Sequence, residues 1–241
     1  MAPIPRQQQA TRLETFVDAA FAFALTMLVV SVDAIPQTYE QLIDAMKRVP
    51  AFAASFAILV MFWHGHYRWS RRFGVEDTGS VVLSLLLVFL VLVFLYPLRL
   101  MMSGALSAMT GGWLRWEFQV TQPQHAQMFA VLYGLAFALM AGVLLLLNAR
   151  VRRRELVPPL NDAERSIARV EMEVWGILAG FGATSALLAA ALPARFLPLA
   201  VWLYAALAIV MPLMSRRWRR MGERAQAPAR EATDAPPSIR P

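Results

Sequence analysis

The sequence contains no cysteine and only three histidines among its 241 residues. The lack of cysteine excludes a disulfide framework, a thiol nucleophile and any Cys-ligated zinc or iron–sulfur site. His64 and His66 would lie about 200° apart around a helix, so they could not bind one metal ion from the same face. We therefore expect neither a metal site nor a cofactor.

Charged residues are also scarce. They make up 16% of the chain, against about 25% in an average soluble domain. Hydrophobic residues reach 58%, and the mean hydropathy is +0.49. The sequence has no phosphate-binding P-loop, no GxSxG element and no HExxH motif, so it carries none of these signatures of catalysis. The composition predicts a membrane protein that is not an enzyme.

Long runs without Asp, Glu, Lys or Arg predict transmembrane helices, because about 20 helical residues cross a hydrocarbon core of roughly 30 Å. The runs are continuously apolar and lack the period-two alternation of β-strands. We therefore predict an all-α integral membrane protein, a bundle of six transmembrane helices within a domain of residues 1–215. The expected spans are residues 15–35, 49–68, 78–99, 126–148, 172–193 and 196–215.

Most of the 23 Lys and Arg residues fall on one side of such a bundle, in the N-terminal segment, the loops at 68–77 and 150–169, and the tail. The positive-inside rule then places both termini in the cytoplasm of a protein that crosses the plasma (inner) membrane several times. The net charge of +7 reports this orientation rather than nucleic-acid binding. The basic, proline-containing tail 216–241 is expected to be disordered.

A cleavable signal peptide is an alternative interpretation of the first span, because Val32-Asp33-Ala34 resembles a small-residue cleavage site. Glu14 and Asp18 argue against it, since they stand where a signal peptide is free of acidic residues. Cleavage would also remove the even number of crossings that the charge distribution supports.

The first span has two chemically different sides. Asp18 is an ionisable residue within a predicted span, which marks a functional or buried polar site. It shares its side of the helix with Ala22, Leu25 and Val29. The other side is an apolar stripe at helical spacing, and Thr26 lies at its edge. The stripe consists of Phe16, Ala19, Phe23, Met27 and Val30. Periodicity alone leaves open whether the stripe faces lipid, protein or a narrow pore.

The end of the second span offers a partner for Asp18. If the first two spans are antiparallel neighbours, His66 lies at the same depth as Asp18, near the cytoplasmic surface. We therefore expect the two side chains to interact, while Trp63 belongs to the aromatic residues near the interface. In the fifth span, Gly176-x-x-x-Gly180, followed by Gly182, predicts a small-residue side for close helix packing.

Two motifs resemble a known family. The segment from Arg12 to Asp18, RLETFVD, is similar to the R-x-x-x-F-S-D opening helix of the prokaryotic branch of the transmembrane protein 175 family. Trp63-His64-Gly65-His66 resembles the W-x-x-H element of that family, and a basic loop and a long apolar third span follow it as expected. Together these features cover roughly residues 12–100.

The resemblance implies a potassium-preferring cation channel, a homotetramer with a central pore lined by the first helix of each subunit. Potassium, other monovalent cations and the lipid bilayer are the implied partners. The implied pore-lining residues, with an apolar constriction at the first, are Phe23, Thr26, Met27 and Val30. The implied structural network that fixes the pore helix consists of Arg12, Phe16, Asp18, Trp63 and His66.

This sequence departs from the family pattern at two positions. Val17 replaces the motif serine, which removes one hydroxyl from the polar network, and Phe23 stands where a branched aliphatic residue is usual. Two other functions stay open at this point. One is a proton-coupled secondary transporter in which Asp18 titrates, although no inverted repeat or broken helix pair is evident. The other is a membrane scaffold that transports nothing.

Overall fold

The computed structural model describes residues 10–30, 36–75, 77–114, 116, 122–153, 160, 162–193 and the single positions 203, 210 and 214. Within these ranges the chain forms α-helices and no β-strand. The helices are α1 (Arg12–Val30), α2 (Tyr39–Met46), α3 (Val49–Phe73), α4 (Thr78–Met109), α5 (Pro123–Arg153) and α6 (Asp162–Ala191).

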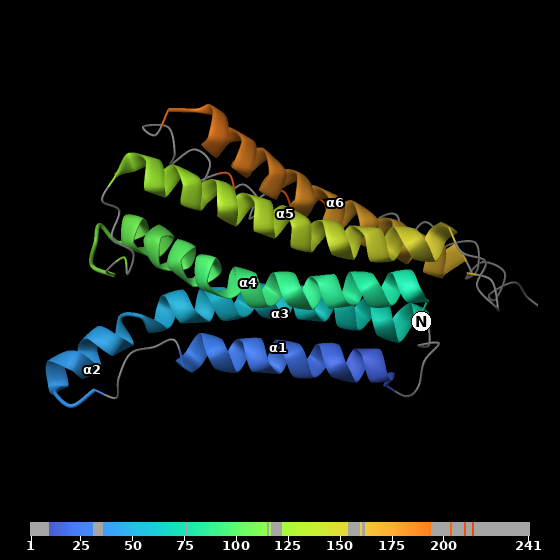
Figure 1. The fold of residues 1–241 in the computed structure, drawn as a ribbon, viewed down its shortest axis with the longest axis horizontal. Coiled ribbons are helices and arrows are strands. Elements are labelled where there is room, and N and C mark those ends of the chain that lie inside the picture. The colour runs from blue at the N-terminus through green and yellow to red at the C-terminus, as the bar shows by residue number, and fades with distance from the viewer. Residues whose placement is uncertain are drawn as a thin grey trace, which may run out of the picture.

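The five long helices run antiparallel to their neighbours along the chain (Figure 1). Helices α3 and α4 lie in the middle of the bundle. Helix α1 packs against both of them on one side, α5 packs against both on the other side, and α6 packs on α5. Helix α2 has no buried residue and projects beyond the end of the bundle. Among the described helices, α1 is therefore peripheral.

Four helical stretches are long and apolar enough to cross a membrane. The first, Tyr39–Phe73, combines α2 and α3, and the others are Thr78–Met109, Gln124–Arg153 and Glu164–Ala191. The spans predicted at 49–68, 78–99 and 126–148 lie within them, and the span predicted at 172–193 overlaps the last but runs past its end at Ala191. Helix α1 has 19 residues and carries three ionisable side chains near its start, and it is not among the four. The span predicted at 196–215 falls almost entirely outside the described residues. The chain is thus an all-helical membrane protein with four candidate spans, which does not establish the predicted count of six.

The helices extend beyond the apolar runs that predicted them. The predicted span ended at Arg99, but helix α4 continues past Pro97 and Arg99 to Met109. The Arg99 side chain is buried in the folded chain. A charge ends a hydrophobic run but not a helix, because arginine is a good helix former. Helix α3 ends where Gly74 adopts the left-handed conformation with φ of 59°, which glycine adopts without steric cost. Asp77 then caps α4 by accepting from the Ser80 backbone N–H at 3.3 Å.

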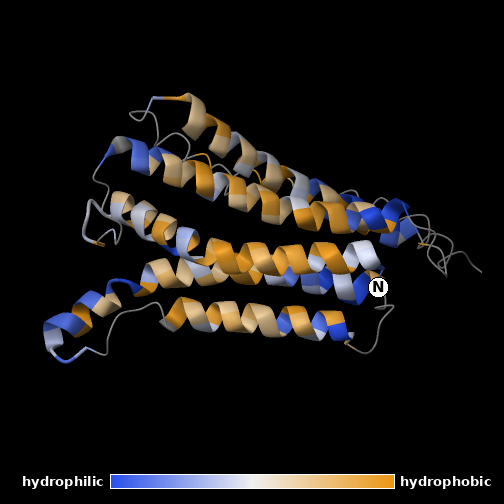
Figure 2. Ribbon diagram, viewed as in Figure 1, coloured by the Kyte–Doolittle hydropathy of each residue, from blue (hydrophilic) through white to orange (hydrophobic). Residues whose placement is uncertain are grey.

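Polar residues gather at one end of the bundle, where α1 and α6 begin and α3 and α5 end (Figure 2). The last turns of α3 and α5 supply most of the positive charge there. We call this the Arg-rich end. The opposite end carries the exposed helix α2, and the stretches between the two ends are predominantly apolar (Figure 2).

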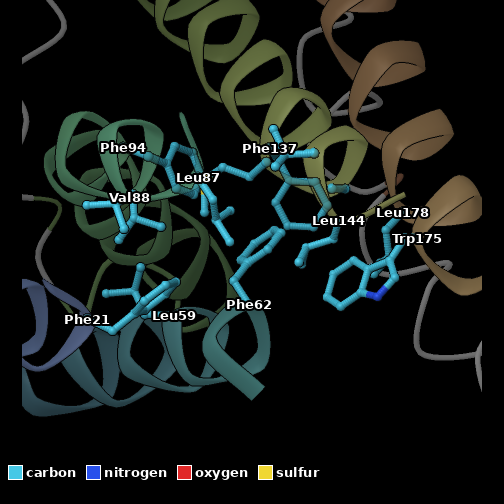
Figure 3. Close-up of a cluster of buried hydrophobic side chains, with 14 of the residues drawn as sticks. Phe21, Leu59, Phe62, Leu87, Val88, Phe94, Phe137, Leu144, Trp175 and Leu178 are labelled. Atoms are coloured by element: carbon cyan, nitrogen blue, oxygen red, sulfur yellow. The ribbon is translucent and has the colours of Figure 1, made fainter. Parts of the chain in front are cut away.

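The core joins α3, α4, α5 and α6 through aromatic and aliphatic side chains (Figure 3). Phe62 is fully buried, and its ring centroid lies 5.4 Å from that of Phe137 and 5.7 Å from that of Trp175. Phe21 brings α1 into the same cluster. This cluster holds the inner side of α1 in place.

Helices α5 and α6 approach each other most closely at two glycines. A Cβ atom on Gly182 would lie 2.8 Å from the Ala138 backbone N, and one on Gly134 would lie 2.9 Å from the Gly182 carbonyl O. The predicted small-residue contact is therefore made by Gly182. Gly176 and Gly180 do not make it, because a Cβ on either would have no neighbour closer than 4.0 Å.

Candidate functional site

Helix α1 divides into a buried face and an exposed face. The buried residues recur at spacings of three and four and are Glu14, Val17, Phe21, Ala24 and Leu28. On the other side, Phe16 is 52% exposed, Phe23 is 57% exposed and Val29 is 53% exposed. The spacing of the buried residues matches one side of a 3.6-residue helix packed on the bundle.

The predicted apolar stripe belongs to the exposed face. Phe23 and Thr26 are exposed, and Met27 is half-buried at the edge of the face. Val30 ends the helix, and its side chain lies outside the described residues. The Thr26 hydroxyl donates to the Ala22 carbonyl at 2.9 Å, so it is satisfied within its own helix. Bulky apolar side chains and the Thr26 hydroxyl therefore lie on a surface that no described residue covers.

Asp18 is half-buried and bonds to the second long helix, although not through the residue that we expected. Its Oδ1 atom accepts a hydrogen bond of 2.8 Å from the indole Nε1 of Trp63. The predicted pairing of Asp18 with His66 is wrong. Trp63 and His66 are one turn apart on α3, so the depth estimate was right to within a turn but selected the wrong side chain. The Trp63 ring also stacks on Tyr67, with centroids 5.5 Å apart.

His66 bonds instead to α4. Its Nε2 atom lies 2.9 Å from the Ser84 hydroxyl oxygen, and the side chain is 1% exposed. Its Nδ1 atom has no hydrogen-bond partner among the described residues. The motif residues thus form two separate contacts, one from α1 to α3 through Trp63 and one from α3 to α4 through His66.

Arg12 and Phe16 do not join these contacts. Both side chains are exposed at the start of α1, and within the described ranges no hydrogen bond or ion pair links Arg12 to Asp18 or His66. The predicted five-residue network is therefore not a single cluster in one subunit.

The polar anchor that the sequence interpretation missed is Glu14. Its side chain is 1% exposed, its Oε1 atom lies 2.9 Å from Nε of Arg71, and its Oε2 atom accepts a hydrogen bond of 3.3 Å from Ser70. Two signals could have revealed it. Thr11-x-x-Glu14 has the capping-box spacing, and the Thr11 hydroxyl does accept from the Glu14 backbone N–H at 3.1 Å. Glu14 also shares the helical face of Val17 and Phe21.

The geometry can be compared with known proteins. The family model described as endosomal/lysosomal potassium channel TMEM175 matches residues 12–97, which contain both motifs. A protein of Marivirga tractuosa named potassium channel is 35% identical over 166 residues, covering 66% of each chain. The crystal structure of a variant of the potassium channel MtTMEM175, in complex with a nanobody–MBP fusion, superposes with a TM-score of 0.74 at 26% identity, covering 90% of this chain and 96% of that one.

The chain belongs to the TMEM175 family. A second TMEM175 structure, of a homologue from Chamaesiphon minutus described as a lysosomal potassium-selective channel, has a TM-score of 0.60 at 21% identity, covers 87% of this chain and 99% of that one, and supports the fold. The chain spans just under two thirds of the length of the Marivirga relative. The members compared are potassium channels rather than enzymes, in agreement with the lack of catalytic motifs.

Proposed function

We propose that this TMEM175 protein is a potassium-preferring cation channel in which four subunits surround a central pore lined by α1. The observation that carries the proposal is the exposed apolar face of α1, where Phe16 and Phe23 are each more than half exposed. The carboxylates of Glu14 and Asp18 contact α3, so beyond the exposed Arg12 at the start of the helix the described part of this face carries no charge. An uncharged, narrow lining conducts ions only when it is wetted, so it can gate by dewetting.

Phe23 forms the constriction in this proposal. It is the most exposed large residue of the face, and four phenyl rings around an axis would close the pore more than smaller aliphatic side chains. Thr26, one turn further along, supplies the face with a hydroxyl. Together with Met27 and Val30 these residues would line the path of the ion.

The proposal also includes the topology. Helix α1 and residues 196–215 complete six spans, the Arg-rich end lies in the cytoplasm with both termini, and the protein resides in the plasma membrane. The excess of Arg in the last turns of α3 and α5 supports this orientation.

Reconstitution into liposomes tests the pore face. Phe23→Ala should increase potassium flux and lower the discrimination between potassium and sodium, because removing the rings widens and wets the constriction. Leu25→Ala, a half-buried position facing the bundle, is the matched control and should change stability more than flux. Subunit number, measured by native mass spectrometry, should be four in both variants. An unchanged rate and flux ratio in Phe23→Ala would overturn the assignment of the pore face.

Single-channel recording separates this function from a proton-coupled transporter that uses Asp18. The hydrogen bond from Trp63 to Asp18 supports a structural carboxylate, so unitary current steps are expected. Flux without steps that is abolished by Asp18→Asn would support the transporter. A lack of any flux in a folded, reconstituted protein would support a scaffold.

A further inference from the structure

The last turns of α3 hold two buried carboxylates from two different helices. Arg71 pairs with Glu14 of α1. Arg68 and Arg72, one turn apart on a neighbouring side of α3, both pair with Glu171 of α6, and the distance from Nη1 of Arg72 to Oε1 of Glu171 is 3.8 Å. The side chain of Glu14 is 1% exposed and that of Glu171 is 8% exposed. The end of α3 is therefore tied to α1 on one side and to α6 on the other.

Each carboxylate depends on its arginine. A buried charge is tolerated when it is paired and hydrogen-bonded, and losing one partner of such a pair is strongly destabilising. Glu14 has one further contact, with Ser70 of the same turn of α3. The Thr15 hydroxyl, in the same turn, bonds to the Thr11 carbonyl at 3.0 Å and not to a neighbouring helix.

Helix α6 is well placed to set the position of this end of α3. One turn after Glu171, the Trp175 ring stacks on Phe62 of α3, with centroids 5.7 Å apart. A Cβ atom on Gly65 would lie 2.2 Å from Trp175 Cζ2, so the indole ring packs directly on the α3 backbone. Glu171 and Trp175 together hold α6 against α3 near the Arg-rich end.

We propose that residues Arg68–Arg72 of α3 couple α6 to α1, and that Glu14 is the positioning residue through which this coupling sets the orientation of the first turn of α1. The proposal rests on the proposed function in one respect: if α1 lines the pore, the α5–α6 hairpin acts on the pore through this link. A change at Glu171 then alters α1 although Glu171 does not touch it.

Hydrogen–deuterium exchange of the protein in liposomes tests the coupling without requiring conduction. Glu14→Gln removes the charge that holds α1, so the amides of residues 16–20 should exchange roughly tenfold faster, as expected when a charge-assisted contact is lost. Glu171→Gln should increase exchange of the same amides by several-fold. The double variant should exchange no faster than Glu14→Gln alone, because both changes act through one link.

The matched control is Asp77→Asn. It removes a charge from another ion pair at the Arg-rich end, between Asp77 of the α4 N-cap and Arg150 of α5, while asparagine caps a helix as well as aspartate does. This variant should leave α1 exchange at the wild-type rate. Equal acceleration by Asp77→Asn would mean general loosening of the bundle and would overturn the proposal, as would wild-type exchange of α1 in Glu171→Gln.

Reversing both charges of the Glu14–Arg71 pair should restore the protection of α1. Glu14→Arg should accelerate α1 exchange, and adding Arg71→Glu should restore much of the protection by reforming the pair in the opposite sense. If the single variant does not fold, the comparison of Glu171→Gln with Asp77→Asn decides the outcome. In single-channel recordings, Glu14→Gln and Glu171→Gln should shift the open probability in the same direction at unchanged unitary conductance. If these variants accelerate α1 exchange but the protein carries no potassium current, the result would support the coupling and contradict only the channel function.

Discussion

Helices α5 and α6 pack backbone against backbone, whereas α1 is held to the bundle only by side chains on one face. The α5–α6 contact brings backbone against backbone at Gly134 and Gly182. Helix α1 touches the bundle through side chains on one face and leaves Phe16 and Phe23 on the other face largely exposed. In a bilayer, close packing at small residues is a main source of helix association, which accounts for the α5–α6 contact, although both helices also expose apolar side chains such as Leu139 and Leu187. The packing of α1 becomes complete only when other molecules cover its second face.

The first prediction, with the largest expected effect, concerns the α5–α6 pair. In Gly182→Val the new side chain would meet the backbone of α5, because even a Cβ atom would lie 2.8 Å from the Ala138 N. We expect loss of most folded protein after detergent extraction. Gly180→Val is the matched control on the same helix, where a Cβ atom has no neighbour within 4 Å. Similar folded yields of the two variants, measured by size-exclusion chromatography, would contradict the backbone contact.

The second prediction compares the two faces of α1 at adjacent residues. Leu28 is fully buried and Val29 is 53% exposed. Leu28→Ala should lower the free energy of unfolding by about 2–5 kcal/mol, the usual effect of a cavity at a buried leucine. Val29→Ala should change the stability of a single subunit much less. Thermal unfolding in detergent measures both, and a larger loss in Val29→Ala would reverse the assignment of the faces.

The third prediction concerns the hydrogen bond that joins the two motifs. Trp63→Phe keeps an aromatic ring but removes the Nε1–H donor to Asp18, which leaves a half-buried carboxylate without that donor. The expected loss is about 1–3 kcal/mol. Trp113→Phe, at an exposed indole, provides the control and should be neutral within error. Equal melting temperatures for Trp63→Phe and the wild type would show that the bond does not stabilise α1.

Helical periodicity predicted that Phe16 and Phe23 share one side of α1, and both are exposed. Ala22 and Val29, which it grouped with Asp18 on the inward side, are exposed as well. The hydrogen-bond partner of Asp18 could not be predicted from the sequence. The expected depth of Asp18 in the membrane restricted its partner to one turn of α3. The rotation of α3 about its axis selects Trp63 over His66, and this rotation depends on packing against α4 and α5. Glu14 was missed because it was considered only as evidence against a signal peptide and not as part of the face that contains Val17 and Phe21.

Helix ends were the least predictable feature of the fold. Arg99 was interpreted as the end of a span, yet α4 continues past it to Met109. The short helix α2 was not predicted, because it is amphipathic and its charged residues leave no long apolar run. By contrast, the family was identifiable from two motifs, RLETFVD and WHGH, in which Asp18, Trp63 and His66 bond to neighbouring helices.

Cysteine accessibility tests the central claim, that the exposed face of α1 lines the pore, most directly. The natural chain has no cysteine, so Thr26→Cys and Leu25→Cys place a single thiol at neighbouring residues of similar depth, one exposed and one half-buried against the bundle. A charged methanethiosulfonate reagent, applied from either side of a planar bilayer, should block potassium current through the Thr26→Cys protein and leave the Leu25→Cys current unchanged. Block of Leu25→Cys with Thr26→Cys unaffected would contradict the account.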